Sequence, residues 1–318
     1  MLANAFATWV ICLVVCVPLG TAMYPPTING YDMVWYDPMT IYTDSKHKIY
    51  NQWYAFKGPG LNLPTEKQLY DTGEDVTYVT SYNPSTPGGP NGGVLGTDQL
   101  FLLPQKRSDG QWYSARFEGK DSYGCPAGKS LILQAELRAG NASSDKQAGI
   151  WPAFWALGES SRKSGSDKRE WPACGEWDIF EATDGYDWSL GTLHYGDTNG
   201  AGMPQDKILP SIDGKDRKLS YTPKDYHTWA LKVDRTDSNW KNQKITWLRD
   251  GNQIQEIKGS DAPNEDVWKT LAHQAYYPVL NVAVGSQMPD TKGAPNDQTV
   301  SGIGSGMLVN YVAFYISS

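Results

Sequence analysis

Three carboxylates stand within six residues of one another in the middle of the chain. Glu176, Asp178 and Glu181 belong to the segment WPACGEWDIFE, which has the short apolar runs of a β-strand. Side chains two residues apart on a strand share a face, so Glu176 and Asp178 are expected to point the same way. A regular strand would direct Glu181 to the opposite face.

The two residues before Glu181 suggest how it could rejoin the other carboxylates. Ile179 and Phe180 are adjacent and both apolar. A β-bulge at this point would direct both of them into the core and return Glu181 to the carboxylate face. Bulges of this kind are common beside active sites, where they re-aim a side chain.

Carboxylates on one face repel each other, and this repulsion raises the pKa of at least one of them. A retaining glycoside hydrolase uses such an arrangement, with an ionised nucleophile and a protonated general acid about 5–5.5 Å apart. The alternatives are an exposed acidic strand and a calcium site, which usually takes six or more oxygens from a loop. The flanking Trp171 and Trp177 argue against a solvated acidic face.

The segments around this motif read as strands separated by turns. No stretch of ten or more residues has a clear helical period. The pair Asp250–Gly251 between two short apolar runs predicts a hairpin with a type I′ turn. We therefore expect an all-β sandwich or barrel in one domain, with long loops at 85–96 and 160–168. The clearest strands are predicted at residues 130–137, 228–233, 244–248, 253–257, 278–284 and 307–316.

Composition excludes several classes of function. The chain has 318 residues, of which 40% are hydrophobic, so it can bury a core of ordinary size. It carries 28 Lys and Arg against 35 Asp and Glu, a net charge of −7, which argues against nucleic acid and against a polybasic membrane surface. Its 13 tryptophans and 19 tyrosines suit flat, hydroxyl-rich ligands.

The N-terminus resembles an export signal. Residues 9–19 are apolar and uncharged, and Gly20–Ala22 supplies the small residues of a cleavage site. We expect residues 1–22 to be a secretory signal peptide and residues 23–318 to be one secreted, extracellular domain. An uncleaved signal anchor is the alternative.

Cleavage would leave two cysteines, Cys125 and Cys174. An even pair in a secreted chain predicts a disulfide, with two buried free thiols as the alternative. Asn141 begins a glycosylation sequon. No Cys or His spacing resembles a zinc site, so no metal ligand is predicted.

The motif Glu-x-Asp-x-x-Glu, preceded by Trp-Pro-x-x-Gly, resembles glycoside hydrolase family 16 in its laminarinase-like branch. Matching pieces run in the family's order from about residue 125 to 316, whereas residues 23–120 match poorly. The other matching pieces are GIWPAFWAL from Gly149, GTLHYG from Gly191, HTW from His227, the hairpin from Trp247 to Gly251, and LNVAVG from Leu280.

The resemblance implies a concanavalin-like β-jelly-roll sandwich of two antiparallel sheets with a concave substrate cleft. It implies Glu176 as the nucleophile, Glu181 as the acid/base and Asp178 as the residue that assists them. No cofactor is expected. A structural calcium ion is common on this fold, although no ligand set for it can be named.

Five further residues are candidates for substrate binding. The resemblance implies that Trp171 packs on the sugar beside the cleaved bond and that His194 approaches the acid/base; each could instead be structural. Trp151 and Trp155 share a strand face, which is either cleft or core. Asn281 could bind sugar hydroxyls or pair with backbone. The remaining tryptophans of the matching segments are predicted to be core: Trp177, Trp229 and Trp247.

The expected function is secreted, retaining endo-hydrolysis of β-1,3-linked glycans, with β-1,3- or β-1,3(4)-glucan first. Alternatives are an endo-β-1,3-galactanase of the same family, a cell-wall transglycosylase, and a lectin-like protein without catalysis. The expected partner is a β-linked polysaccharide. We expect a monomer that binds no nucleic acid and, after signal cleavage, no membrane.

Overall fold

The structure is a computed structural model. It describes residues 23–40, 49–60, 65–81, 98–165, 168–196, 207–208, 218–286 and 291–318. The predicted signal peptide, residues 1–22, and the predicted loop at 85–96 lie outside the described residues. Within the described ranges, no helix has both the length and the apolar character needed to span a bilayer.

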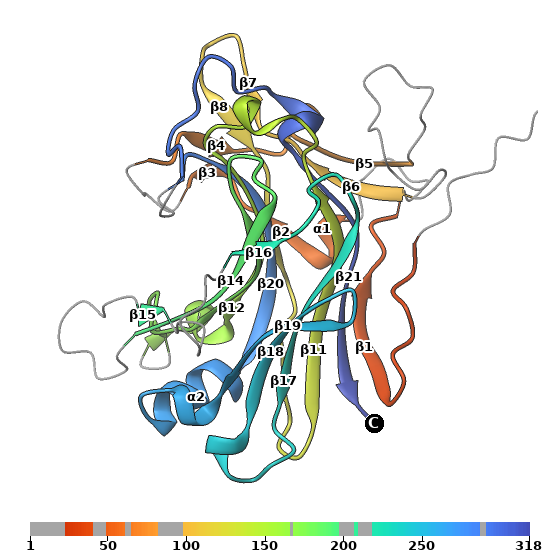
Figure 1. The fold of residues 1–318 in the computed structure, drawn as a ribbon, viewed down its shortest axis with the longest axis vertical. Helices are drawn as coiled ribbons and strands as arrows, with labels where there is room; N and C mark the ends of the chain where they lie inside the picture. The colour runs from red at the N-terminus through yellow and green to blue at the C-terminus, as the bar shows by residue number, and fades with distance from the viewer. Residues whose placement is uncertain are drawn as a thin grey trace, which may run out of the picture.

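Two large β-sheets form the two layers of the fold (Figure 1). One has eight strands among the described residues, in the order β19-β18-β17-β11-β21-β6-β5, with β1 also paired to β21. These strands are β1 (Tyr31–Asp37), β5 (Thr77–Ser81), β6 (Asp98–Leu102), β11 (Ser130–Ala139), β17 (His227–Asp234), β18 (Lys244–Arg249), β19 (Asn252–Lys258) and β21 (Met307–Ser317).

The second sheet carries the carboxylate motif. Its nine described strands follow the order β15-β14-β13-β12-β20-β9-β2, with β10 paired to β20 and β16 paired to β14. They are β2 (Trp53–Ala55), β9 (Arg116–Gly119), β10 (Tyr123–Gly124), β12 (Ile150–Gly158), β13 (Glu176–Ala182), β14 (Trp188–Tyr195), β15 (Lys207–Ile208), β16 (Leu219–Ser220) and β20 (Ala275–Val284).

The architecture confirms the predicted antiparallel sandwich and adds a small third sheet. That sheet has the order β3-β4-β8-β7, and its β4–β8 pair is parallel. It comes from the N-terminal region that matched the family poorly. A parallel pair needs a long crossover, which here runs through β5 and β6 of the eight-stranded sheet. Its strands are β3 (Gly58–Pro59), β4 (Gln68–Tyr70), β7 (Gln105–Lys106) and β8 (Trp112–Ser114).

The predicted strands and hairpin are also confirmed. All six predicted runs fall on β11, β17, β18, β19, β20 and β21. At the hairpin, Asp250 and Gly251 have φ values of 51° and 75°. Positive φ at both central residues is what a type I′ turn requires, and glycine and aspartate tolerate it.

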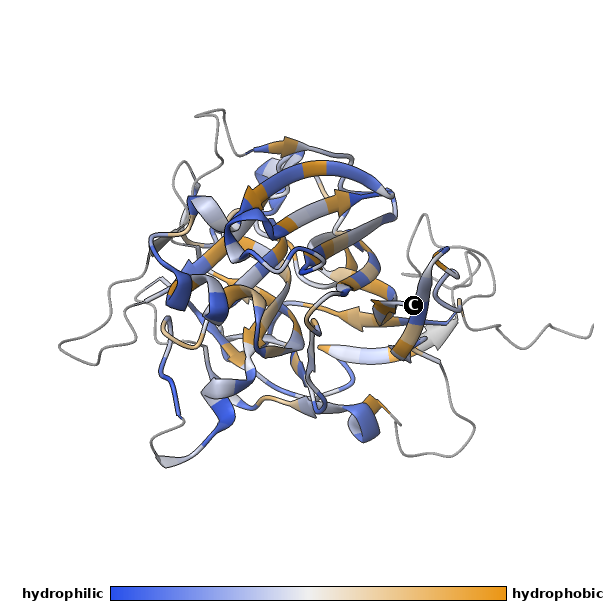
Figure 2. Ribbon diagram, turned by 90° about the horizontal axis from the view of Figure 1, so that it is seen from below, coloured by the Kyte–Doolittle hydropathy of each residue, from blue (hydrophilic) through white to orange (hydrophobic). Residues whose placement is uncertain are grey.

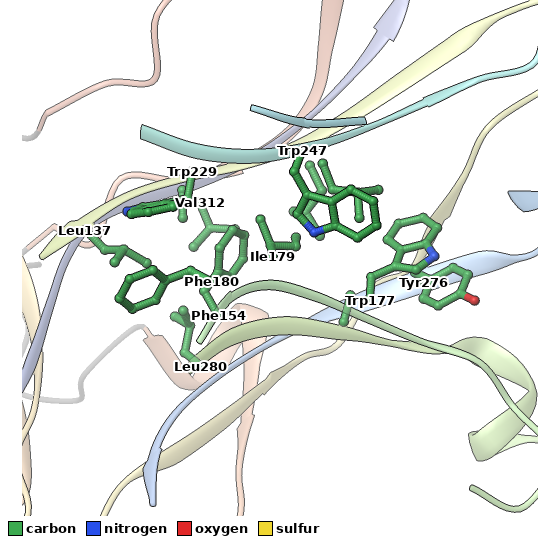
Figure 3. Packing of buried hydrophobic residues seen from close by; sticks show 14 of the residues in the cluster. Leu137, Phe154, Trp177, Ile179, Phe180, Trp229, Trp247, Tyr276, Leu280 and Val312 are labelled. Carbon is green, nitrogen blue, oxygen red and sulfur yellow. The ribbon is translucent and has the colours of Figure 1, made fainter. Parts of the chain in front are cut away.

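The main core fills the space between the two large sheets. Orange and blue segments alternate along the strands in Figure 2, as expected when one face of each strand is buried. Trp177 stacks on Tyr276 with ring centroids 3.6 Å apart, and Trp229 and Trp247 are both fully buried (Figure 3). The three tryptophans predicted to be core are therefore confirmed as core.

Two short α-helices lie among the described residues beside several 3-10 turns: α1 (Ile49–Gln52) and α2 (Glu265–Ala272). Helix α2 was not predicted, because eight residues are too few for a helical period to stand out. Its start does carry a signal: Asn264 accepts a hydrogen bond from the Val267 amide at 2.9 Å, as an N-cap does. The carbonyl of Leu271 accepts a hydrogen bond from the Trp177 indole, which ties α2 to strand β13.

The predicted disulfide is wrong in this structure, since Cys125 and Cys174 are free and buried. The Cys125 thiol lies within 3.5 Å of the Val233 carbonyl of the eight-stranded sheet. Cys174 instead packs in a cluster on the outer face of the nine-stranded sheet. Burial raises the pKa of these thiols, to about 11 for Cys125 and about 12 for Cys174. The structure instead shows the alternative, two buried free thiols in separate clusters.

Candidate active site

A β-bulge in β13 brings the three carboxylates onto one face. Along β14, the cross-strand partners of Glu176, Asp178 and Glu181 step evenly by two residues: His194, Thr192 and Leu190. Ile179 has no partner in the pairing with β12, so it is the extra residue of the bulge. Both Ile179 and Phe180 are buried in the core, as predicted. The carboxylates therefore occupy successive positions on the outer face, about 6.8 Å apart along the strand.

All three carboxylates are shielded from water. Glu176 and Glu181 are each 8% exposed, and Asp178 is 3% exposed. Burial and the charge of Asp178 raise the pKa of Glu176 to about 8, with His194 opposing the shift. The same causes raise the pKa of Glu181 well above its ordinary value. Because burial and like charge act on both glutamates, the two carboxyls cannot both ionise cheaply.

Glu176 and Asp178 share a histidine, and Glu176 also has a tryptophan partner. The His194 Nε2 lies 3.0 Å from Asp178 Oδ2 and 3.7 Å from Glu176 Oε1. The Trp171 indole donates a hydrogen bond of 3.1 Å to Glu176 Oε2. Trp171 is also 48% exposed, so about half of this residue is accessible to solvent beside Glu176. The structure thus brings these two predicted residues to the motif.

Trp151 and Trp155 both lie on the carboxylate side of β12, but they differ in exposure. The Trp151 indole donates to Glu181 Oε1 at 3.0 Å and remains partly exposed. Trp155 is 6% exposed, and its indole donates to Asn281 Oδ1 at 2.6 Å. Asn281 in turn donates to the Tyr70 hydroxyl at 3.0 Å. Trp155 and Asn281 therefore form the hydrogen-bonded floor of this face.

Folding also assembles a group of possible metal ligands that the sequence did not predict. Glu176, Asp178 and His194 each offer one ligand atom, and these atoms lie within 4.8 Å of one another. It is the single such group of acidic, His or Cys side chains found among the described ranges. The histidines are scattered along the chain, so this proximity arises from the pairing of β13 with β14. For a calcium ion, three ligand atoms fall short of the usual six or more.

The opposite end of the same face carries residues that sequence reasoning missed. Arg116 donates to Glu118 at 2.8 Å, and Arg162 donates to the other oxygen of Glu118 at 3.2 Å. The Arg162 guanidinium also lies over the Tyr277 ring, and the more exposed Tyr54 lies beside it. The alternation Arg116-x-Glu118 is typical of a strand, but it does not predict that these side chains lie on the same sheet face as the carboxylate motif.

Cross-strand register places these residues in line with the carboxylates. Starting from Asp178, the partners across the sheet are Trp155, Val279, Glu118 and Tyr54. Directly paired residues lie on the same face, so one row joins β13 to the edge strand β2. The row spans four strand spacings, about 19 Å in all.

This arrangement has the parts of an acid/base site for a long, hydroxyl-rich ligand. One carboxyl with a strongly raised pKa can donate a proton, and a neighbouring carboxylate on the same face can act as a nucleophile. Partly exposed indole rings next to both glutamates suit the C–H faces of sugars.

No protein-family model matches the chain. It is 26% identical over 202 residues to a glucan endo-1,3-β-glucosidase from Cryptopygus antarcticus. That match covers 61% of this chain and 59% of the relative's length.

Among solved structures, an endo-1,3-β-glucanase from Streptomyces sioyaensis superposes with a TM-score of 0.70. It is 23% identical, and the match covers 93% of this chain and all of that one. The chain has the fold of an endo-1,3-β-glucanase. A Zobellia galactanivorans protein solved with laminaritriose and laminaritetraose shares this fold at a TM-score of 0.59 and 19% identity, over 91% of this chain and all of that one. The resemblance to the laminarinase-like branch is confirmed by these similarities.

Proposed function

We propose that the protein is a secreted glycoside hydrolase that cleaves β-1,3-linked glucan internally, with retention of configuration. The observation that carries this proposal is the bulged strand β13. It presents Glu176 and Glu181 on one buried face, with Asp178 between them. A protein without catalysis has little reason to bury three carboxylates side by side, because each burial disfavours the charged form.

The first half of the reaction breaks the glycosidic bond. Glu181, whose pKa burial raises well above its ordinary value, donates its proton to the glycosidic oxygen. The Glu176 carboxylate attacks the anomeric carbon, the carbon–oxygen bond breaks, and the leaving chain departs as an alcohol. Asp178 and His194 lie beside Glu176 and set its charge state. A covalent glycosyl-enzyme is the product of this step.

The second half releases the other product. Glu181, now a carboxylate, takes a proton from water as the water oxygen bonds to the anomeric carbon. The bond to Glu176 breaks, and both carboxyl groups return to their starting states. Two inversions at the same carbon give net retention. A sugar hydroxyl in place of water would give transglycosylation by the same steps.

The substrate assignment is supported by the relatives. The Cryptopygus relative and the Streptomyces structure are both described as acting on 1,3-β-glucan. The Zobellia structure holds short laminarin oligosaccharides. These similarities favour β-1,3-glucan over β-1,3-galactan.

A polysaccharide panel tests the proposal. The purified protein and its Glu176→Gln variant are incubated with laminarin, mixed-linkage β-glucan, β-1,3-galactan and xyloglucan, and the products are sized over time. We expect laminarin oligosaccharides of the β-anomer at first, and a loss on the order of 10⁴-fold or more in the variant. Cleavage of galactan alone would change the substrate and keep the mechanism. Binding without cleavage of any glycan would favour the lectin alternative.

A further inference from the structure

The β13 bulge lies against two polar side chains from the opposite sheet. The Trp247 indole donates a 2.7 Å hydrogen bond to the Asp178 carbonyl, and the Gln255 amide donates at 3.3 Å to the Gly191 carbonyl. Trp247 and Gln255 are cross-strand partners on β18 and β19. Figure 3 shows Trp247 projecting from its sheet across the core toward Ile179 and Trp177.

The positions of the two acceptors explain why these donors matter. Asp178 is the last paired residue of β13 before the bulge, and Gly191 lies on β14 between the partners of Asp178 and Glu181. A bulge disrupts the hydrogen-bond ladder locally. A backbone carbonyl that turns toward an apolar core without a partner is destabilising, because nothing replaces the hydrogen bond to water that it loses. Trp247 and Gln255 supply hydrogen-bond donors to the two carbonyls beside the bulge.

The close approach of Trp247 depends on a residue without a side chain. A Cβ atom at Gly191 would lie 2.6 Å from both Cδ1 and Nε1 of the Trp247 ring. The indole is rigid, so even a methyl group there would displace it. Trp247, Gln255 and Gly191 thus act as one buried contact between the sheets, which we call the bulge clamp.

We propose that the bulge clamp holds Glu181 in register with Glu176, and that Trp247 is its main positioning residue. Without the bulge, the alternation of a strand would direct Glu181 to the opposite face from Glu176 and Asp178. The hydrogen bonds of the clamp go to backbone carbonyls, so they act on the chemistry through strand geometry. The predicted effect of the clamp on turnover rests on the proposed function. Its predicted effect on the environment of Glu181 does not, and the titration of Glu181 measures that effect.

The matched control is Trp229, the neighbouring core tryptophan. It is as deeply buried as Trp247, comes from the same sheet, and packs against the bulge residue Phe180 at 4.8 Å. Within the described residues, its indole nitrogen has no hydrogen-bond partner. Replacing either tryptophan by Phe removes the same atoms, and only Trp247→Phe also removes a hydrogen bond to the motif.

Kinetics give the first readout. Trp247→Phe should lower kcat by about 10- to 100-fold with KM nearly unchanged, because small misplacements of a reacting group cost rates of this size. Trp229→Phe should leave kcat within about two-fold once both variants are measured well below their unfolding temperatures. Gly191→Ala, which displaces the indole, should reproduce the effect of Trp247→Phe.

The second readout needs no substrate. Carboxyl ¹³C signals of labelled glutamate are titrated in the parent protein and in each Trp→Phe variant, with Glu181 assigned by the signal lost in Glu181→Gln. Trp247→Phe should move the Glu181 titration down in pH as that carboxyl becomes hydrated, whereas Trp229→Phe should leave it in place. Equal titrations and equal kcat values in the two variants would overturn the inference. An inactive parent protein would instead defeat the proposed function, while the titration would still decide on the clamp.

Discussion

The two ends of one sheet face use the same residue type in opposite ways. On β13, Glu176 and Glu181 lie beside Asp178, and their pKa values rise through burial and mutual repulsion. Three strand spacings away, on β9, Glu118 accepts hydrogen bonds from Arg116 and Arg162. Both oxygens of this carboxylate are engaged by guanidinium donors, so it links two segments of the structure.

The difference shows that neighbours, rather than residue type or face, decide what a glutamate does. The acidic end keeps its carboxyls reactive at a cost in stability. The basic end satisfies its carboxylate and thereby ties β9 to the segment that contains Arg162. A Glu→Gln substitution at each end therefore probes both roles.

The largest contrast is expected in turnover. Glu181→Gln removes the proton donor and should lower kcat on laminarin by about 10²- to 10⁴-fold, the usual contribution of general acid catalysis. An aryl glycoside with a good leaving group needs no such proton, so its glycosylation step should be largely spared. Glu118→Gln, the matched change at the basic end, should leave kcat within about three-fold. Equal losses at the two positions would contradict the assignment of roles.

A smaller contrast is expected in stability, where Glu181→Gln should stabilise the protein and Glu118→Gln should destabilise it. The raised pKa of Glu181 means that the folded state holds more protons than the unfolded state above about pH 4.5. The free energy of unfolding therefore falls as the pH rises toward the pKa of Glu181 in the folded protein. The Glu181→Gln variant has no proton to lose at this position, so its stability should not fall in this way. We expect this variant to melt at least about 2 °C above the parent protein at pH 8 and to match it near pH 4.

The same substitution at the basic end should destabilise the protein. Glu118→Gln leaves Arg116, whose side chain is only 5% exposed, without its carboxylate. We expect a loss of about 1–3 kcal/mol in the free energy of unfolding at pH 7, below the full penalty of a fully buried pair. Urea denaturation of Glu118→Gln and Glu181→Gln measures the change in the free energy of unfolding for both variants. A stabilising Glu118→Gln would show that the arginines do not need this partner.

The smallest effect is expected at the outer end of the row, at Tyr54. Its ring is 55% exposed and lies in register with Asp178 across four strand spacings. If a glycan chain follows this row, Tyr54→Ala should raise KM for long laminarin oligosaccharides by about 2- to 10-fold, the worth of one aromatic contact. Short oligosaccharides should be unaffected. A KM change that is independent of oligosaccharide length would place the chain elsewhere.

Local patterns predicted much of the fold and the chemical centre of the site. Alternating apolar runs located the long strands, and Asp250–Gly251 located the hairpin turn. The adjacent Ile179 and Phe180 were enough to predict the bulge, because two neighbouring apolar side chains cannot both face the core on a regular strand. The eight-residue helix α2 and the third sheet escaped notice, since both are too short to show a period.

Sequence alone thus determined which carboxylates share a face, because that depends on the alternation within one strand. Tertiary structure alone decided their neighbours. His194 reaches Asp178 through the pairing of β13 with β14, Trp247 reaches its carbonyl across the core, and the two cysteines fall into separate clusters. Such contacts join segments far apart in the chain, and only the packing of one sheet on the other selects them among the many pairings that local patterns allow.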